Sequence, residues 1–407
     1  MKKIVQAWTG ISLVQRIVAG GVIGALLGMF VPSEGGIAIL GDVFVGALKA
    51  IAPLLVFFLV ISSLCYAGKS HGGVIRTVII MYMFSTFLAA IVAVTASSVF
   101  PVTLTLVDAA TDMAAPQGVA EVLRTLLMNV VTNPVQSLVS ANYIGILVWA
   151  VLIGIALRKA SDTTKQSLND ISAALSKTVT WIIQCAPFGI MGLVYNTVSV
   201  NGLSTFTEYG KLLAVLLGSM LFIYFVTNPI LVFWCIRKNP YPLIFKCLKK
   251  SAITAFFTRS SAANIPINME ACAEMGLDKD TYSVTIPLGA TINMDGAAIT
   301  ITVMTLAAAH TLGIAVDIPS AIILSILATL SACGASGVAG GSLLLIPMAC
   351  SLFGISNDIA MQIVGIGFII GVIQDSVETA LNSSSDLLLS ASAEFRQWRL
   401  EGKEIKF

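Results

Sequence analysis

Long stretches of apolar residues, separated by short polar segments, dominate the sequence. A helix needs roughly 20 apolar residues to cross a bilayer, so the pattern predicts an all-α integral membrane protein with about eight spans. The predicted spans are 13–31, 43–66, 74–100, 142–158, 178–198, 211–236, 283–312 and 355–390. The first residues, 1–21, contain no convincing small-residue cleavage site, so we expect a retained helix in place of a removed signal peptide.

Two further apolar stretches, 242–275 and 318–352, are interrupted near their middles by Ser, Gly and Ala. Unpaired backbone groups cannot face lipid, so an interrupted segment at membrane depth must be buried against protein or line a cavity. We therefore expect two re-entrant helical hairpins, a feature that accompanies inverted repeats in transporters. Two poorly hydrophobic full spans are the alternative.

Composition narrows the class of protein. Of the 407 residues, 57% are hydrophobic and 11% are charged, with a net charge of +2, whereas a soluble domain has about 25% charged residues. This composition excludes an ordinary cytosolic enzyme, a disordered chain and a protein that binds nucleic acid. The seven cysteines form no CxxC pair, and His71 lies far from His310 in sequence, so neither a metal cluster nor a Ser-His-Asp triad is indicated.

Basic residues mark alternate connections between the spans. By the positive-inside rule they place both termini in the cytoplasm, with an even number of spans. Acidic residues prevail in the other connections, and no linker separates a second soluble domain, so we expect one transporter unit over 1–407. The basic positions are Lys2, Lys3, Lys69, Arg76, Arg158, Lys159, Lys165, Arg237, Lys238, Lys246, Lys249, Lys250, Arg396, Arg399, Lys403 and Lys406.

Acidic residues inside apolar helices are costly, which makes the last predicted span notable. Asp375, Thr379, Asn382 and Asp386 follow each other at helical spacing and share one stripe, with Glu378 at its edge. An internal aqueous site is the first interpretation. The alternative is an exposed cytoplasmic extension of the helix.

The seventh predicted span contains an Asn-Met-Asp sequence between Gly289 and Gly296. Glycines on either side suggest local unwinding, which would free backbone carbonyls to join Asp295 as hard oxygen ligands for a cation such as Na⁺. A helix kink with a structural Asp is the alternative. The small residues of 258–266 and 337–342 would form the hairpin tips, where free N–H groups could hold a carboxylate or could simply belong to loops.

Taken in order, these motifs resemble the glutamate-transporter homologue family of sodium/dicarboxylate and amino-acid symporters, most closely its bacterial serine/threonine:sodium members. The resemblance covers essentially the whole chain. Its motifs are TRSSAANIPINM (258–269), PLGATINMDGAA (287–298), GVAGGS (337–342), DSVETALNSSSD (375–386), TNP (132–134) and APFG (186–189).

This resemblance implies a homotrimer in the bacterial inner membrane that works by an elevator motion. It implies a scaffold of about 1–72 and 133–200. It also implies a moving transport domain of about 73–100 and 205–396, with hairpins at about 241–275 and 318–352. Sodium would be a transported coupling ion, and no prosthetic group is expected.

The resemblance also implies three sodium sites. One combines Asn382 and Asp386 with the backbone of Gly289 and Asn293, and a second contains Asn293 and Asp295. The second site is completed by Tyr82, Ser85 and Thr86.

Thr291 and Met294 match the third site. The sequence 331–337 is one residue longer than the family pattern, so no ligand from the second hairpin is assigned.

For a substrate, the resemblance places the α-carboxylate near Ser261, Val338 and the Asn382 amide. Asp375 would accept the α-ammonium in a charge-assisted pair. Thr379 would line the pocket, and Arg259 and Ser260 would stand at the tip of the first hairpin.

Two departures from the family pattern bear on the substrate. Glu378 replaces the Arg that acidic-amino-acid transporters use, and it would repel a side-chain carboxylate. Ala297 replaces a Thr. A small neutral L-amino acid, such as L-serine or L-threonine, fits these facts, and one with a hydroxyl group could donate to Glu378. Alternatively Glu378 pairs with Arg259.

Other functions are compatible with parts of the pattern. They are a proton- or sodium-coupled dicarboxylate or acidic-amino-acid symporter of the same fold, an intramembrane hydrolase with Ser260 or Ser261 as nucleophile, and a passive channel. Neither histidine lies in the motif cluster, and the buried charges form no repeated pore ring, so we expect a transporter and not an enzyme.

Overall fold

The computed structural model describes residues 11–31, 36–66, 73–106, 128, 131–333, 335 and 340–405. Within these ranges the secondary structure is helical and contains no strand, which confirms the all-α expectation. Short 3₁₀ turns (η1, η4) and single π-turns (η2, η3) interrupt the α-helices.

The helices are α2 (Leu13–Phe30), α3 (Ala38–Tyr66), α4 (Gly73–Val99), α6 (Pro134–Val139), α7 (Tyr143–Ala156), η1 (Leu157–Lys159), α8 (Asp162–Gln184), α9 (Ala186–Asn201), α10 (Thr205–Phe222), η2 (Ile223–Thr227), α11 (Asn228–Ile236), α12 (Tyr241–Cys247), η3 (Leu248–Ala252), α13 (Ile253–Thr258), α14 (Ser261–Glu274), α15 (Lys279–Ile292), α16 (Asp295–Thr311), α17 (Ile318–Ala332), η4 (Ser342–Leu345), α18 (Ile346–Ser351) and α19 (Asn357–Leu400).

Several of these helices can cross a membrane. In the described part of the chain, five are long and apolar enough, and the pair α8 and α9, bent by 55°, would make a sixth. The five are Ala38–Ser62, Gly73–Val99, Thr205–Ile236, Lys279–Thr311 and Asn357–Leu400. The sequence predicts eight spans; further apolar helices, such as Gln15–Phe30, are shorter, at 10–17 residues.

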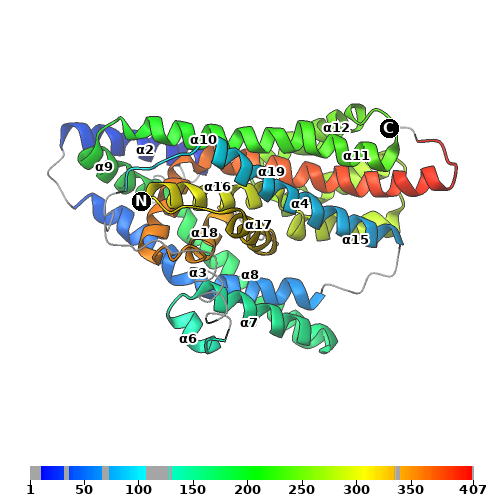
Figure 1. Ribbon diagram of the computed structural model, residues 1–407, viewed down its shortest axis with the longest axis horizontal. Coiled ribbons are helices and arrows are strands. Elements are labelled where there is room, and N and C mark those ends of the chain that lie inside the picture. Colours follow the sequence, from blue (N-terminus) through cyan, green and yellow to red (C-terminus); the bar gives the residue numbers. More distant parts are fainter. Residues whose placement is uncertain are drawn as a thin grey trace.

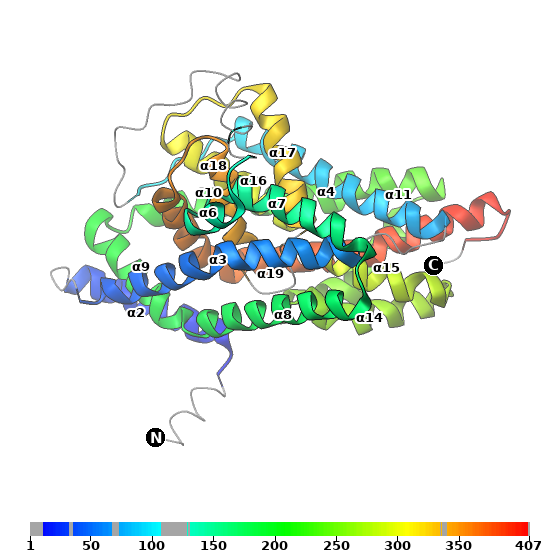
Figure 2. The same cartoon turned by 90° about the horizontal axis from the view of Figure 1, so that it is seen from below.

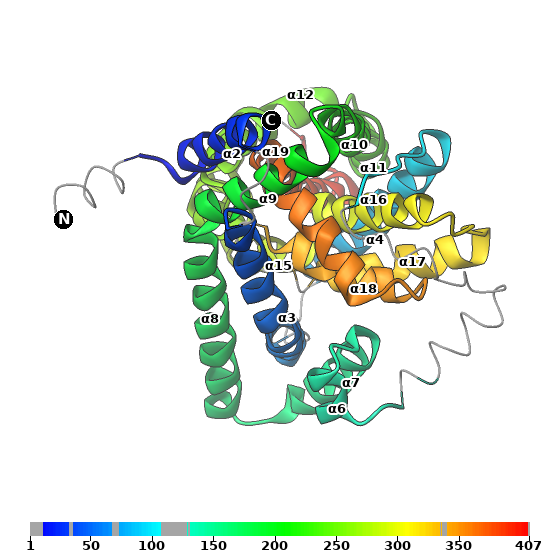
Figure 3. The same cartoon turned by 90° about the vertical axis from the view of Figure 1, so that its left-hand side faces the viewer.

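The helices pack as two groups. In the first, α2, α3, α7, α8 and α9 pack chiefly against one another; in the second, α4 and α10 through α19 do so. Figure 3, a view along the long axis, shows α3 and α8 on one side and α4, α10 and α16 on the other. Contacts of α19 with α2, α3 and α9 connect the groups, and an ion pair between Lys49 of α3 and Asp358 of α19 also crosses the boundary.

Helix α2 lies unusually close to α9 because three glycines face it. A Cβ on Gly20, Gly24 or Gly28 would stand 2.1, 2.3 or 2.9 Å from a backbone oxygen of α9. Small residues at this four-residue spacing let two membrane helices approach at backbone distance. Figure 2 shows the two helices lying along each other.

Helix α19 runs through the middle of the second group and along the long axis of the molecule (Figure 1). It packs against α4, α10, α11 and α13 to α16. Ser383, Ser384 and Ser385 are fully buried, and so are Leu387 to Leu389 beyond them. The acidic stripe therefore lies inside the protein, and the alternative of an exposed helical extension is wrong.

The first interrupted stretch reverses direction at Arg259. This residue is left-handed (φ 49°) and ends α13, and the Ser260 hydroxyl then caps α14 by accepting from the Ala263 N–H at 3.2 Å. Helix α14 packs back against α13 and η3, so 241–274 is a helical hairpin.

The second interrupted stretch consists of α17 followed by η4 and α18. Asp317 caps α17 by accepting from the Ser320 N–H at 2.9 Å. The pKa of the Asp317 carboxyl is lowered because the Ser320 side chain and backbone N–H both donate to it. The tip, Gly337 to Ala339, lies outside the described residues.

Candidate functional site

Three elements bring the predicted polar residues together: the middle of α4, a break between α15 and α16, and the middle of α19. The break comprises Asn293 (φ −99°, ψ 80°) and Met294 (φ −119°, ψ 54°), neither of which is helical. The predicted unwinding between Gly289 and Gly296 is thus observed. It lets the Asn293 and Asp295 side chains reach toward neighbouring helices from one short segment.

Asp295 faces α4. Its two carboxylate oxygens accept hydrogen bonds from the Ser85 hydroxyl (2.8 Å) and the Thr86 hydroxyl (3.2 Å). The Thr86 oxygen also accepts the Met294 N–H at 3.2 Å. Ser85 lies 3.3 Å from Oδ1 of Asn228, the first residue after the π-turn η2. Ser85 and Thr86 of the predicted α4 trio therefore form one buried cluster with the Asp295 carboxylate, whereas the Tyr82 hydroxyl bonds to the carbonyls of Thr285 and Asp386.

Asp386 is held on the other side of the break. Its Oδ1 accepts from the Asn293 amide at 2.9 Å, and its backbone carbonyl accepts from the Tyr82 hydroxyl at 2.9 Å. A Cβ at Gly289 would lie 2.9 Å from both Asp386 Oδ1 and the Tyr82 oxygen. Glycine at 289 is therefore what allows the α15 backbone to reach this carboxylate.

Neither of these buried carboxylates has a cationic partner in the described part of the chain. Asp295 is 0% exposed and Asp386 is 1% exposed, and no ion pair within the described residues includes either of them. The Asn293 Oδ1 atom is also buried, and no group among the described residues donates a hydrogen bond to it. Buried charge needs a compensating charge or a metal, and these hard oxygens suit a hard cation.

Asn382 links the break to α19. Its Oδ1 accepts the Gly296 N–H at 2.7 Å, and its amide nitrogen lies 3.5 Å from the Met294 sulfur.

Thr291 stands apart, because it is half-buried and its hydroxyl donates to the Leu288 carbonyl of its own helix at 2.7 Å. Of the two residues assigned to a third cation site, only Met294 contacts the rest of the cluster.

Asp375, one turn before Thr379 on α19, lies between the two hairpins. Its Oδ1 accepts the Gly340 N–H of the second hairpin at 3.1 Å, and its Oδ2 lies 3.5 Å from an Arg259 nitrogen of the first. None of the described residues donates a hydrogen bond to the Oδ2 atom. A cavity of about 20 Å³ adjoins Asp375, Arg259 and Gly340, and side chains of α2, α8 and α9 close it.

Glu378 is bound by neutral donors. The Thr300 hydroxyl (2.7 Å), the Ser342 hydroxyl (2.9 Å) and the Gln374 amide (2.5 Å) all reach its Oε2 atom. The alternative in which Glu378 pairs with Arg259 is not what the structure contains, because Arg259 pairs with Asp375 and three closer donors satisfy Glu378. No donor from the described residues occupies its Oε1 atom.

Comparison with known proteins identifies the class. The model of the "Sodium:dicarboxylate symporter family" matches residues 13–394. The chain belongs to this family. Three relatives, each named "Serine/threonine transporter SstT", are similar over nearly their full length.

The relative from Streptococcus thermophilus is 56% identical over 400 residues, covering 98% of this chain and 100% of the relative. The one from Bifidobacterium adolescentis is 55% identical over 406 residues, covering 100% and 94%. The one from Streptococcus agalactiae serotype III is 57% identical over 395 residues, covering 97% and 98%.

Membership of a symporter family confirms the expectation of a multi-pass membrane transport protein and not a hydrolase. The serines once considered as nucleophiles have structural positions in this symporter: Ser260 caps α14, and Ser261, 3% exposed, occupies its first turn. The Thr379 hydroxyl donates to the Asp375 carbonyl at 2.8 Å. Val338 lies outside the described residues.

Sequence reasoning missed the residues that support the symporter's acidic groups. Gln374 could have been found, because it precedes Glu378 by four positions, the spacing at which helix neighbours meet. Thr300 is hidden in the continuous apolar run of α16, and Asn228 lies in another such run. Ser342 is part of a quoted motif, but nothing in its spacing points to Glu378.

Proposed function

We propose that this chain is a sodium-driven symporter that imports L-serine or L-threonine. The observation that carries the proposal is the pair of buried carboxylates, Asp295 and Asp386, that have no cationic partner among the described residues. The names of the relatives support the substrate, and the family supports coupling to sodium.

Sodium would neutralise the two carboxylates in turn. One ion would bind among Tyr82, Ser85, Thr86, Asn293 and Asp295. The Ser85 and Thr86 hydroxyls already contact the Asp295 carboxylate. A second would bind Asp386 and the Asn382 side chain with the carbonyls of Gly289 and Asn293. Thr291 and Met294 would contribute to a third. Each ion replaces lost hydration with protein oxygens, which is the requirement for binding a hard cation in an apolar interior.

The substrate would bind between the hairpins. Its α-ammonium would donate to Asp375 Oδ2, the atom that lacks a hydrogen bond and faces Arg259. Its α-carboxylate would lie near Ser261 and the residues around Val338, with the Asn382 amide. Thr379 would line the pocket, and Arg259 and Ser260 would close it from the first hairpin.

Glu378 would select against acidic substrates. A buried carboxylate repels a substrate carboxylate strongly, because little water screens the two charges. Since its three described donors all reach Oε2, the Oε1 atom can accept the hydroxyl proton of serine or threonine. The same residue thus favours a hydroxyl and rejects aspartate.

We further propose that the two packing groups are the scaffold and the transport domain of an elevator in a homotrimer. The chain would lie in the bacterial inner membrane with both termini in the cytoplasm. Packing within each group and sparse contact between them support a relative movement. The two hairpins would re-enter the membrane from opposite sides.

The test is uptake of radiolabelled L-serine into liposomes that contain the purified protein. We expect uptake to require an inward Na⁺ gradient, with K⁺ or choline unable to replace it. Excess threonine should compete, and aspartate or succinate should not. Competition by aspartate or succinate would contradict the role given to Glu378 and favour a dicarboxylate or acidic substrate. Uptake driven by a proton gradient without Na⁺ would contradict the cation assignment.

A further inference from the structure

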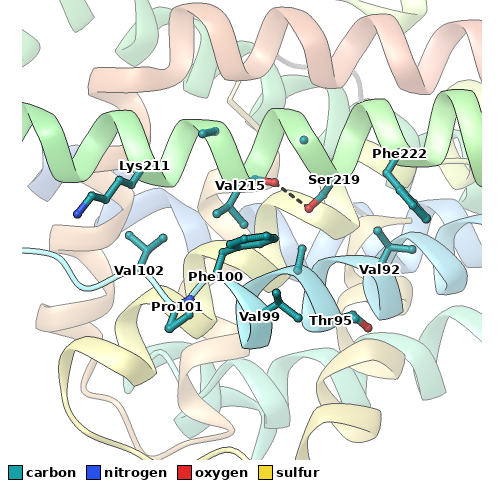
Figure 4. A pocket seen from close by; sticks show the side chains of 13 residues that line it. Val92, Thr95, Val99, Phe100, Pro101, Val102, Lys211, Val215, Ser219 and Phe222 are labelled. Carbon is teal, nitrogen blue, oxygen red and sulfur yellow. Dashed lines mark hydrogen bonds between the residues drawn. The ribbon is translucent and has the colours of Figure 1, made fainter.

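A large groove lies between α4 and α10, and none of the polar-site residues lines it. Its volume is about 900 Å³. On α4 it is lined by the stripe Val92, Thr95, Ala96 and Val99, and beyond the helix by Phe100, Pro101 and Val102. Helix α10 supplies the opposite wall, from Lys211 to Phe222 (Figure 4). We call this the α4–α10 groove.

Apart from Lys211, the side chains that line the groove are apolar or have hydroxyl groups bonded within their own helix. Only two hydroxyl groups line it, and both donate to the backbone of their own helix: Thr95 to the Ile91 carbonyl at 2.9 Å and Ser219 to the Val215 carbonyl at 2.7 Å. A cavity whose polar groups are satisfied internally suits an apolar occupant. At the rim, Val99 and Phe100 are 62% and 64% exposed, so the groove opens to the surroundings of the helices.

One end of the groove carries a positive charge. Lys211 is exposed and stands beside Val102, while Phe222 and Val92 mark the other end (Figure 4). None of the ion pairs in the described ranges includes Lys211. The nearest carboxylate on the same helix, Glu208, accepts two hydrogen bonds from Thr105 instead.

The length of the groove fits a single acyl chain. From Lys211 to Phe222 the helix rises about 16 Å, and one leaflet of the hydrocarbon core is about 15 Å deep. An acyl chain that begins at the lysine would therefore end near Phe222. Gly218 makes room for it, because a Cβ at this position would meet no atom within 4 Å.

We propose that the α4–α10 groove binds one anionic glycerophospholipid, with an acyl chain along the groove and the phosphate on Lys211. The lipid belongs to the leaflet on the side where α4 ends and α10 begins. An ammonium near a membrane surface attracts anionic lipid. The apolar walls of the groove would take the place of the neighbouring lipids around the acyl chain.

The test is native mass spectrometry of the purified protein with dioleoyl-phosphatidylglycerol or dioleoyl-phosphatidylcholine. These lipids have the same chains and differ in headgroup charge. We expect one tightly retained phosphatidylglycerol per chain in the wild type. Lys211→Gln should weaken phosphatidylglycerol binding about fivefold and abolish the preference over phosphatidylcholine. Gly218→Leu should abolish retention of both lipids by filling the groove.

Two matched variants control for charge and bulk elsewhere. Lys177→Gln removes an exposed lysine of α8, and Gly210→Leu adds the same side chain to α10 at an open position outside the groove. Both should retain lipid like the wild type. Equal lipid retention in Lys211→Gln, Gly218→Leu and their controls would overturn the proposal. A change of oligomeric mass in Gly218→Leu without lipid loss would also overturn it, and would assign the groove to a second copy of the chain.

Discussion

At the scale of single residues, the donors around Glu378 are more informative than the carboxylate itself. Because three of them meet on Oε2, the orientation of the side chain is fixed before a substrate arrives. Thr300 and Gln374 also bond to each other at 2.6 Å, so the support is a connected network. We interpret Thr300, Ser342 and Gln374 as positioning residues for a hydroxyl acceptor.

Removing one of these donors should weaken substrate recognition. We expect Thr300→Val to raise the half-saturating serine concentration about tenfold, the loss typical of one hydrogen bond to a charged group. Alanine, which lacks the hydroxyl, should be affected less. Thr302→Val is the control, because the Thr302 hydroxyl is equally buried on α16 and makes no hydrogen bond. An equal effect of both variants on serine would contradict the positioning role.

The cation assignment has a matched test on α4. Ser85→Ala removes an oxygen that contacts Asp295, and we expect the half-saturating Na⁺ concentration for serine uptake to rise about tenfold. Ser97→Ala removes a buried hydroxyl without a hydrogen-bond partner on the same helix. It should leave the Na⁺ dependence unchanged. If Ser85→Ala altered only the maximal rate, Ser85 would not be a sodium ligand.

The sequence predicts which residues carry charge in this site better than it predicts their partners. Acidic groups in apolar helices stand out because they are costly, and Asp295, Asp375 and Asp386 were found in this way. The partner of Arg259 was not, because spacing along α19 cannot distinguish Asp375 from Glu378 one turn away. That choice depends on where the hairpin tip lies in three dimensions.

At the scale of elements, the apolar runs predict the helices well, and the glycines flanking Asn293 predict the break between α15 and α16. The π-turns η2 and η3 and the 55° bend between α8 and α9 have no such signal. The number of spans is also hard to predict, because α8 has charged residues along a helix that continues into the apolar α9.

The close contact of α2 and α9 gives a prediction about stability. Gly24→Ala places a methyl group 2.3 Å from the Met191 carbonyl oxygen, so the helices must separate. We expect a loss of about 1–3 kcal/mol, the usual cost of overpacking. Thermal unfolding in detergent should report it as a lower midpoint. Gly21→Ala, where the nearest atom is an Ile190 side-chain carbon at 3.9 Å, should cause no loss.

At the scale of the whole molecule, the Lys49–Asp358 ion pair joins the two packing groups and provides a test of the proposed movement between them. In a cysteine-free background, the two cysteines of the double variant Lys49→Cys, Asp358→Cys can be joined by a cleavable cross-linker. We expect the cross-linked protein to take up no serine. Cleavage should restore uptake. The elevator requires this result, because the two groups must move past each other during transport.

The Lys250–Glu274 pair provides the control, since it joins η3 and α14 inside one group and its lysine is as exposed as Lys49. The same cross-link between cysteines at 250 and 274 should leave uptake intact. Full uptake by the cross-linked 49–358 protein would contradict a relative movement of the groups.

One unbroken helix, α19, carries Asp375, Thr379, Asn382 and Asp386 on a single stripe. Since each helical residue turns the chain by about 100°, one inserted or deleted residue between Asp375 and Asp386 would swing the cation ligands away from the substrate ligands. A change of length there would therefore disrupt both sets of ligands together. A substitution such as one at Glu378 would alter the substrate site and leave the distance along the helix to Asp386 unchanged.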